Sequence, residues 1–165
     1  MPQQENTETM EQKLVIFDLD NTLRDNAGSG HMIPCNLGLS MNVAANWAPW
    51  QAYVNENSPT IKYMCNLYES MVDDPEYKVM IVTSSSFGTM GWLCKWSISL
   101  PDTIIERNIT DNRSPKEFKE DFISSMRRID LWVDDDPIVC NIMRTMGVKV
   151  VQVTHNHYEH QKDKG

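Results

Sequence analysis

The stretch LVIFDLDNT, residues 14–22, decides the fold class, because a short apolar run passes directly into two aspartates and a threonine. Leu14–Phe17 is too short for a helix and lacks the alternation of a strand with one wet face. It therefore predicts a buried strand of a parallel sheet. Asp18 and Asp20 then stand at the carboxyl end of that strand, the edge where open α/β sheets bind ligands.

Further apolar runs of the same kind are separated by helical patterns. The runs are Val79–Val82, Leu131–Val133 and Val148–Val151, with Thr103–Ile105 as a weaker fifth. Helices are predicted to open at Ser58-Pro59 and to cover about 87–98, 115–129 and 137–146. Strands that alternate with helices predict an α/β fold, a three-layer sandwich in which helices cover both faces of a parallel sheet.

The last helix has defined ends in the sequence. Asp136 precedes a proline and is expected to be its N-cap, and Gly147 is a natural residue just past its end. At helical spacing, Ile138, Ile142 and Met146 are expected to form its buried face.

One region does not fit the alternation of strands and helices. Residues 24–57 contain Gly28-Ser29-Gly30, two prolines and three aromatic side chains, and we expect a small insert or lid over the sheet. The domain is expected to span 13–153, between a flexible start at 1–12 and a polar tail at 154–165.

Composition narrows the class of protein. A chain of 165 residues with 41% hydrophobic and 23% charged residues, and no apolar run near ~18 residues, predicts one soluble globular domain. The net charge of −8 argues against a broad grip on nucleic-acid backbone, which needs clustered Lys and Arg. The polar first residues lack a secretory signal, so a cytoplasmic location is expected. The four cysteines show no C-x-x-C spacing and are expected to be reduced core thiols.

A second acidic group follows the fourth apolar run. Asp134 and Asp135 directly follow Leu131–Val133, so neighbouring strands would bring them close to Asp18. Two like charges at ~4 Å repel by roughly 4 kcal/mol at an effective dielectric constant of 20. Such a cluster shifts its pKa values or binds a cation, and a hard, oxygen-seeking ion such as Mg²⁺ fits best.

These segments resemble the motifs of the haloacid dehalogenase (HAD) superfamily. Residues 17–22 resemble its motif I, DxDx[TV], the strand that ends at Thr83 resembles motif II, and Asp134-Asp135 resemble motif IV. The order and spacing match across nearly the whole chain. Within the superfamily, Lys95-Trp96 and residues 143–148 are most similar to the phosphatase domain of bacteriophage polynucleotide kinases and related small phage phosphatases.

The resemblance implies a role for each matching residue. Asp18 would be the nucleophile that forms an aspartyl-phosphate, and Asp20 the acid that protonates the leaving alcohol and then activates water. The chemistry also needs such a pair, because a carboxylate can attack phosphorus while a second carboxyl carries the proton. Thr83 would bind the phosphoryl group, and Lys119 would be the motif III lysine. The metal ligands would be Asp18, Asp20, Asp134 and Asp135, holding Mg²⁺.

The same resemblance implies a set of substrate contacts. They are His31, Trp47, Trp50, Ser84, Ser85 and Arg113. Trp47 and Trp50 have two interpretations, since they could stack on a base or pack the insert onto the sheet.

Two lysines compete for the motif III role. Ser114 to Glu117 form a capping-box pattern that opens a helix whose buried stripe includes Phe118. At ~100° per residue Lys119 lies beside that stripe, whereas Lys116 points nearly opposite, so Lys119 is favoured. The alternative is that both lysines are solvated.

The chain departs from the polynucleotide phosphatases at one informative place. They usually carry Ser-Gly-Arg after motif II, whereas this chain has Thr83-Ser84-Ser85, so the substrate-facing arginine is missing there.

The sequence therefore predicts a Mg²⁺-dependent phosphomonoesterase, which the resemblance directs to a nucleotide or a nucleic-acid 3′-phosphate end. The alternatives are a small-metabolite or free-nucleotide phosphatase and a catalytically silent, phosphate-recognising protein. The expected protein is monomeric, lies in the host cytoplasm if phage-encoded, and has no extended nucleic-acid surface. No kinase is expected, because no G-x-x-x-x-G-K-[ST] loop occurs.

Overall fold

A single five-stranded parallel sheet organises the protein. The computed structural model describes residues 11–154, and the strand order is β3-β2-β1-β4-β5. The strands are β1 (Lys13–Phe17), β2 (Tyr77–Thr83), β3 (Thr103–Glu106), β4 (Leu131–Asp134) and β5 (Val150–Gln152). Every predicted strand is present, including the weak fifth. Most of the predicted flexible start and polar tail lies outside the described residues.

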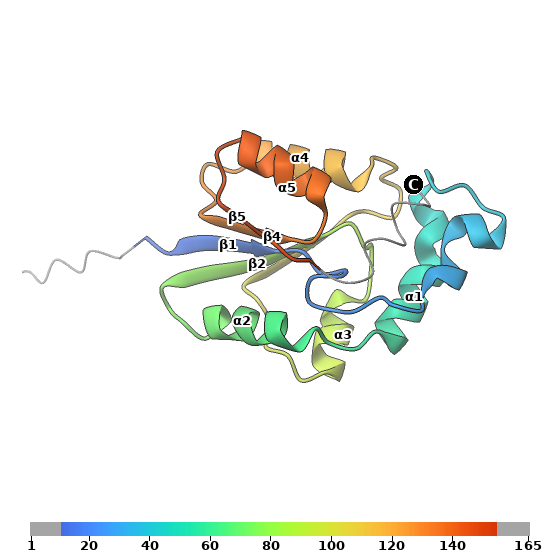
Figure 1. Cartoon of the computed structure of the whole chain (residues 1–165), viewed down its shortest axis with the longest axis horizontal. Coiled ribbons are helices and arrows are strands. Elements are labelled where there is room, and N and C mark those ends of the chain that lie inside the picture. The colour runs from blue at the N-terminus through green and yellow to red at the C-terminus, as the bar shows by residue number, and fades with distance from the viewer. Residues whose placement is uncertain (1–10, 155–165) are drawn as a thin grey trace, which may run out of the picture.

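Helices cover both faces of this sheet. Figure 1 shows α2 (Lys62–Val72) and α3 (Thr89–Lys95) below it, and α4 (Pro115–Ser124) and α5 (Pro137–Thr145) above it. Successive residues of β1 point to opposite layers, since Val15 and Phe17 join the core under α2 and α3, whereas Ile16 joins the core under α4 and α5. The three-layer α/β sandwich is confirmed. No helix between residues 11 and 154 is long and apolar enough to cross a membrane.

The segment between β1 and α2 forms the predicted small insert. It contains three short 3₁₀ helices (Gly30–Met32, Pro34–Leu37 and Ala44–Trp47) followed by α1 (Ala48–Asn57). The insert, blue to cyan in Figure 1, lies beyond the carboxyl ends of the strands. It therefore stands beside the edge of the sheet where the acidic motifs end.

The predicted start of the first long helix is wrong. Ser58 does not cap it, because the Ser58 hydroxyl donates to Asn26 Oδ1 at 2.8 Å. The Ile61 backbone N–H donates to the Leu23 carbonyl at 2.8 Å, and α2 begins only after Ile61. Residues 58–61 are thus held against the loop that follows β1, and this tertiary contact overrides the local helix signal at Ser58-Pro59.

The buried face of α5 is also wrong. Ile138 and Met146 are 58% and 43% exposed, whereas Val139, Cys140 and Met143 are buried. Apolar residues occupy two adjacent stripes of this helix, and packing against the sheet selects the stripe that the sequence pattern did not favour. Both ends of α5 are confirmed, with Asp136 as a side-chain N-cap and Gly147 at φ +82° just past it.

Two smaller expectations also fail. The helix predicted over about 115–129 is shorter, because α4 ends at Ser124, and Met126 and Ile129 pack against the core on the α4 and α5 side of the sheet from the chain that follows the helix. Cys35 and Cys94 are exposed, so only half of the cysteines are core thiols.

Candidate active site

The centre of the site lies where β1 and β4 end side by side. The Asp18 backbone N–H donates to the Val133 carbonyl at 2.9 Å, which extends the pairing of the two strands. Lys119 enters from α4 and places Nζ 2.8 Å from Asp18 Oδ1 and 2.7 Å from Asp134 Oδ2. All three side chains are buried. Lys116 is exposed and belongs to the outer face of α4.

The carboxylates of Asp18, Asp134 and Asp135 form one buried group. One ligand oxygen from each lies within 4.8 Å of the others. Burial, reinforced by the charge of Asp134, raises the pKa of Asp18 to about 7. Burial and the charge of Asp18 likewise hold the pKa of Asp135 well above its usual range. A single ammonium group, that of Lys119, faces three carboxyl groups, so the site carries an excess of negative charge whenever all three are ionised.

This excess fits a bound cation. All donors in the group formed by Asp18, Asp134 and Asp135 are carboxylate oxygens, the ligands of Mg²⁺ or another hard cation. The Asp20 carboxylate, which we expected among the ligands, is not part of this group.

The carboxylates of Asp18 and Asp134 are oriented by neighbouring donors. Thr22 Oγ1 donates to Asp18 Oδ2 at 3.0 Å. Trp132 Nε1 donates to Asp134 Oδ2 at 3.1 Å, and the Asp136 backbone N–H donates to Asp134 Oδ1 at 3.0 Å. The two side chains are therefore fixed before any ligand arrives.

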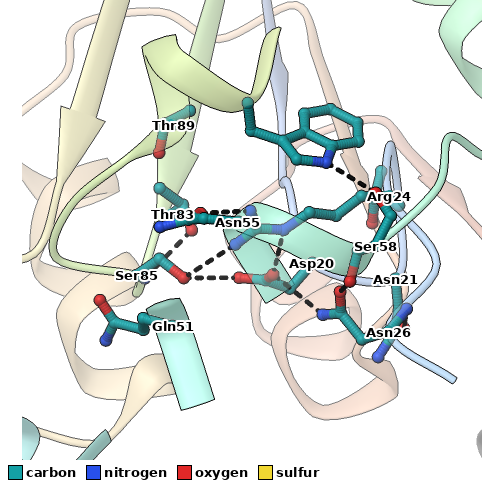
Figure 2. A network of polar contacts seen from close by, with 12 residues as sticks. Asp20, Asn21, Arg24, Asn26, Gln51, Asn55, Ser58, Thr83, Ser85 and Thr89 are labelled. Atoms are coloured by element: carbon teal, nitrogen blue, oxygen red, sulfur yellow. Dashed lines mark hydrogen bonds and ion pairs between the residues drawn. The ribbon is translucent and has the colours of Figure 1, made fainter. Parts of the chain in front are cut away.

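Asp20 lies in a separate polar network (Figure 2). Its Oδ1 accepts from Arg24 Nε at 2.7 Å and from Asn26 Nδ2 at 2.9 Å, and its Oδ2 accepts from Ser85 Oγ at 2.8 Å. Burial alone would raise the pKa of Asp20, but the charge and hydrogen bonds of Arg24, with those of Asn26 and Ser85, lower it below its usual value. Asp20 is ionised at neutral pH.

Arg24 connects this network to the insert. The residue is fully buried, and its Nη1 donates to Asn55 Oδ1 of α1 at 2.6 Å. Asn55 Nδ2 in turn donates to the Phe87 carbonyl in the loop after β2 at 3.1 Å. The sequence alone did not indicate Arg24 and Asn55 as residues of the site. The Asp-x-x-x-Arg spacing was visible, but outside a helix it does not indicate a pair.

The predicted motif II residues surround the end of β2. Thr83 is buried, and its Oγ1 accepts from the Ser85 backbone N–H at 3.1 Å. Ser85 turns its hydroxyl to Asp20, whereas Ser84 lines a neighbouring cavity. The three adjacent residues thus face three different parts of the site.

That cavity has a volume of about 350 Å³ and lies between the insert and the chain that follows β3. Trp47 and Trp50 line it with their rings edge to face, 5.4 Å apart between centroids. Their indole N–H groups donate within the insert, to the Met41 carbonyl and to Ser29 Oγ. Both tryptophans therefore pack within the insert and line the cavity, and their stacking on a base stays a prediction.

The two remaining predicted substrate contacts, Arg113 and His31, lie in different surroundings. Arg113 lies at the cavity, but its guanidinium makes ion pairs of 2.6 Å with Asp111 and with Asp121. His31 is exposed on the insert, packs edge to face on Tyr53 and does not line the cavity.

Comparison with solved structures places this geometry in a known fold. The chain is similar to a chain of the Pnkp1/Rnl/Hen1 RNA repair complex, at 19% identity and a TM-score of 0.65, over 89% of this chain and 44% of that one. It is also similar to a HAD family enzyme from Bacteroides thetaiotaomicron solved with magnesium and inorganic phosphate, at 12% identity and a TM-score of 0.58, over 92% and 99%. The chain has a HAD-like fold.

A further solved structure supports the same fold. A haloacid dehalogenase-like hydrolase from Streptococcus pneumoniae matches at 13% identity with a TM-score of 0.59, over 87% of this chain and 85% of that one. No protein-family model and no curated protein sequence matches the chain. This chain spans about half the length of the repair-complex chains that it matches.

Proposed function

We propose that the protein is a Mg²⁺-dependent phosphomonoester hydrolase that works through an aspartyl-phosphate on Asp18. The observation that carries the proposal is the buried group of Asp18, Asp134 and Asp135 with Lys119 bonded between two of them. A purely structural ion pair needs one carboxylate for one lysine. The additional carboxylates are explained if a cation and a phosphoryl group complete the site.

Each residue has a defined task in this chemistry. An oxygen of Asp18 attacks phosphorus, and the bond from phosphorus to the leaving oxygen breaks. Lys119 stabilises the negative charge of the transferring group, and the Thr83 hydroxyl donates to one of its oxygens. Asp18, Asp134 and Asp135 would hold Mg²⁺, which neutralises phosphoryl charge when it is bound. Water then attacks the aspartyl-phosphate, which releases phosphate and restores the Asp18 carboxylate.

Asp20 is the proton carrier in this proposal. It gives a proton to the leaving alcohol in the first half-reaction and takes one from water in the second. Because Arg24 favours the ionised form of Asp20, the protonated form is the scarcer one. The network of Figure 2 thus favours the ionised Asp20 that takes a proton from water in the second half-reaction. The first half-reaction requires the scarcer, protonated form.

The proposed substrate is a nucleotide or a nucleic-acid 3′-phosphate end. The chain is similar to a chain of an RNA repair complex, and its motifs resemble those of polynucleotide phosphatases. In addition, two tryptophans line the cavity that Ser84 also lines. These three features support the proposal. With a net charge of −8, recognition is expected to rest on the terminal nucleotide rather than on a long strand. A free-nucleotide or small-metabolite phosphatase is the alternative, whereas intact Asp18, Asp20 and Asp134 count against a silent binding protein.

A hydrolysis screen tests the proposal. The purified full chain is assayed with Mg²⁺ for phosphate release from nucleoside monophosphates, 3′-phosphorylated oligonucleotides and sugar phosphates. We expect turnover that excess EDTA abolishes and that is at least about a thousandfold slower in Asp18→Asn, which removes the nucleophile with little change in volume. Asp73→Asn, at an exposed position after α2, is the control. Turnover by Asp18→Asn at more than a tenth of the wild-type rate contradicts the covalent mechanism.

A further inference from the structure

Arg107 occupies a position that the proposed chemistry has not used. It directly follows β3, and its backbone N–H donates to the Thr83 carbonyl at 3.1 Å, so β2 and β3 remain joined up to this point. Its side chain lines the cavity together with Ser84, the residue after Thr83. Arg107 therefore lines the same cavity as Ser84, which directly follows the proposed phosphoryl-binding residue Thr83.

The Arg107 side chain is buried without an ion pair among the residues that the structure describes. The residue is 7% exposed, its Nη1 donates to the Arg113 backbone carbonyl, and its Nε is buried with no hydrogen-bond partner among residues 11–154. The other buried cations in that part of the chain, Arg24 and Lys119, both make ion pairs with aspartates. Buried charges are normally paired, so Arg107 is the exception.

The neighbouring acids are engaged elsewhere. The charge of Asp111 acts on Arg107 from a distance, but its carboxylate is paired directly with Arg113 at 2.6 Å. Glu117, which also lines the cavity, accepts from the Ser114 backbone N–H in the capping box of α4. Burial lowers the pKa of Arg107, but a guanidinium remains charged at neutral pH. The cavity thus holds a charged fork of donors with unused bonding capacity.

We propose that Arg107 binds a second phosphate of the substrate, the one on the 5′ side of the nucleoside whose 3′-phosphate is hydrolysed. The inference rests on the proposed function and names the substrate class for the same site. A guanidinium is suited to phosphate oxygens, because its planar donors match them in pairs. A cavity of about 350 Å³ has room for one nucleotide beside Trp47 and Trp50.

This assignment supplies the missing cation of motif II from another strand. Thr83-Ser84-Ser85 contains no arginine, but β3 lies beside β2, and Thr83 pairs with Glu106 immediately before Arg107. The sheet register therefore places an arginine next to the motif II loop. The 5′ phosphate can be a monoester, as in a nucleoside 3′,5′-bisphosphate, or a diester, as in the last nucleotide of a strand.

Three substrates separate these cases. They are a nucleoside 3′-phosphate, the matching nucleoside 3′,5′-bisphosphate, and a 3′-phosphorylated dinucleotide with a 5′-hydroxyl. We expect kcat/KM to be roughly 10- to 100-fold higher for the bisphosphate and the dinucleotide than for the nucleoside 3′-phosphate. This is the gain that hydrogen bonds between charged groups typically provide. In Arg107→Gln this ratio should fall to about threefold or less. Arg128→Gln, which removes a surface arginine paired with Asp130, should keep the wild-type ratio.

The outcomes distinguish this inference from the proposed function. Hydrolysis without preference in the wild type, or an unchanged ratio in Arg107→Gln, overturns the role of Arg107 and leaves the phosphatase intact. A gain for the bisphosphate alone identifies a free nucleotide, and an equal gain for the dinucleotide identifies a strand end. If no phosphomonoester is hydrolysed, calorimetric binding of the bisphosphate and the nucleoside 3′-phosphate decides: an affinity difference lost in Arg107→Gln supports the inference, and its absence refutes it. Arg107→Lys replaces Arg107→Gln if the latter does not fold, with a partial loss of preference expected.

Discussion

The acid cluster around Asp18 and the network around Asp20 are two residues apart in sequence but are built on opposite principles. Around Asp18, three carboxyl groups share one ammonium group, and burial raises the pKa of Asp18 to about 7. In the second region, the Asp20 carboxylate accepts hydrogen bonds from a guanidinium, an amide and a hydroxyl group, and the pKa of Asp20 is lowered. The Asp18 side chain is buried and that of Asp20 is only 19% exposed, so burial alone does not explain the opposite shifts of their pKa values.

The difference indicates what each region needs from outside the chain. The Asp20 network is electrically balanced and fully bonded by the protein, and it joins the insert to the sheet through Asn55. The cluster around Asp18 has more negative charge than the protein neutralises. A cation and the electrophilic phosphorus of a substrate are the natural complements of such a site. The Asp20 network thus holds its carboxylate, the proposed proton carrier, in place and attaches the insert, whereas the Asp18 cluster is a binding centre.

Removing the single cation of the Asp18 cluster should give the largest effect. In Lys119→Ala, kcat/KM should fall by about 10²–10⁴, because the transferring phosphoryl group loses its buried charge partner. Lys116→Ala, three residues away on the exposed face of α4, should change it by less than about twofold. Steady-state kinetics on one phosphomonoester checks both variants. Equal losses would show that the contacts of Lys119 with Asp18 and Asp134 do not matter for turnover.

Removing the cation of the balanced network should instead affect folding. Arg24→Met leaves the Asp20 carboxylate without its partner and should lower the free energy of unfolding by about 3–5 kcal/mol. The double variant Asp20→Asn/Arg24→Met removes the stranded charge and should recover part of that loss. Urea unfolding followed by tryptophan fluorescence measures all three proteins. No recovery in the double variant would mean that Arg24 acts through packing alone.

The pH dependence of stability should expose the excess charge of the Asp18 cluster. Without metal, the pKa of Asp18 is raised from 3.8 to about 7 in the folded protein. Protonated Asp18 therefore stabilises the fold, fully so below about pH 4, and this stabilisation is lost as the pH rises through 7. Bound Mg²⁺ stabilises the ionised form and should therefore raise the Tm more at pH 7.5 than at pH 5. Thermal unfolding in EDTA and in Mg²⁺ at both pH values measures the difference. An equal gain at the two pH values contradicts the proposed ligand group, and Asp18→Asn should flatten the metal-free pH dependence.

The sequence alone was sufficient to predict the structure where several neighbouring residues carry the same pattern. Apolar runs that end in Asp18 and Asp134 predicted the strands, their parallel arrangement and the meeting of the two acids at one edge. Helical periodicity placed Lys119 beside the buried stripe of its helix, the family resemblance made it the motif III lysine, and its Nζ contacts both carboxylates. In each case local pattern and tertiary structure agree.

The sequence was insufficient where the decisive contact joins distant segments. The bond from Arg24 to Asn55 spans 31 residues, and the chain between them has no regular pattern that fixes their relation. Ser58 looked like a helix cap because its competitor, Asn26, becomes a neighbour only after folding. Arg107 gave no sign of facing the cavity, since that depends on the register of β3 against β2.

The smallest predicted effect tests how firmly the insert is attached to the balanced network. Gly88 has φ +85°, and a Cβ placed there would lie 2.1 Å from Asn55 Nδ2, an atom held in place by its bond to the Phe87 carbonyl. Gly88→Ala should therefore lower the free energy of unfolding by about 1–3 kcal/mol, through backbone strain and displacement of Asn55. Gly91→Ala, in α3 with no atom within 4 Å of the added carbon, should be neutral or stabilising by up to about 1 kcal/mol. Chemical unfolding of both variants measures the contrast. Because Asn55 also bonds Arg24, Gly88→Ala should in addition lower turnover severalfold. The Mg²⁺ dependence should change little, since the hydrogen bonds and ion pairs of Asp18 and Asp134 within residues 11–154 involve no residue of α1. A loss of Mg²⁺ affinity comparable to the loss of stability would show that the two regions are coupled, and that the separation between the Asp20 network and the binding centre does not hold.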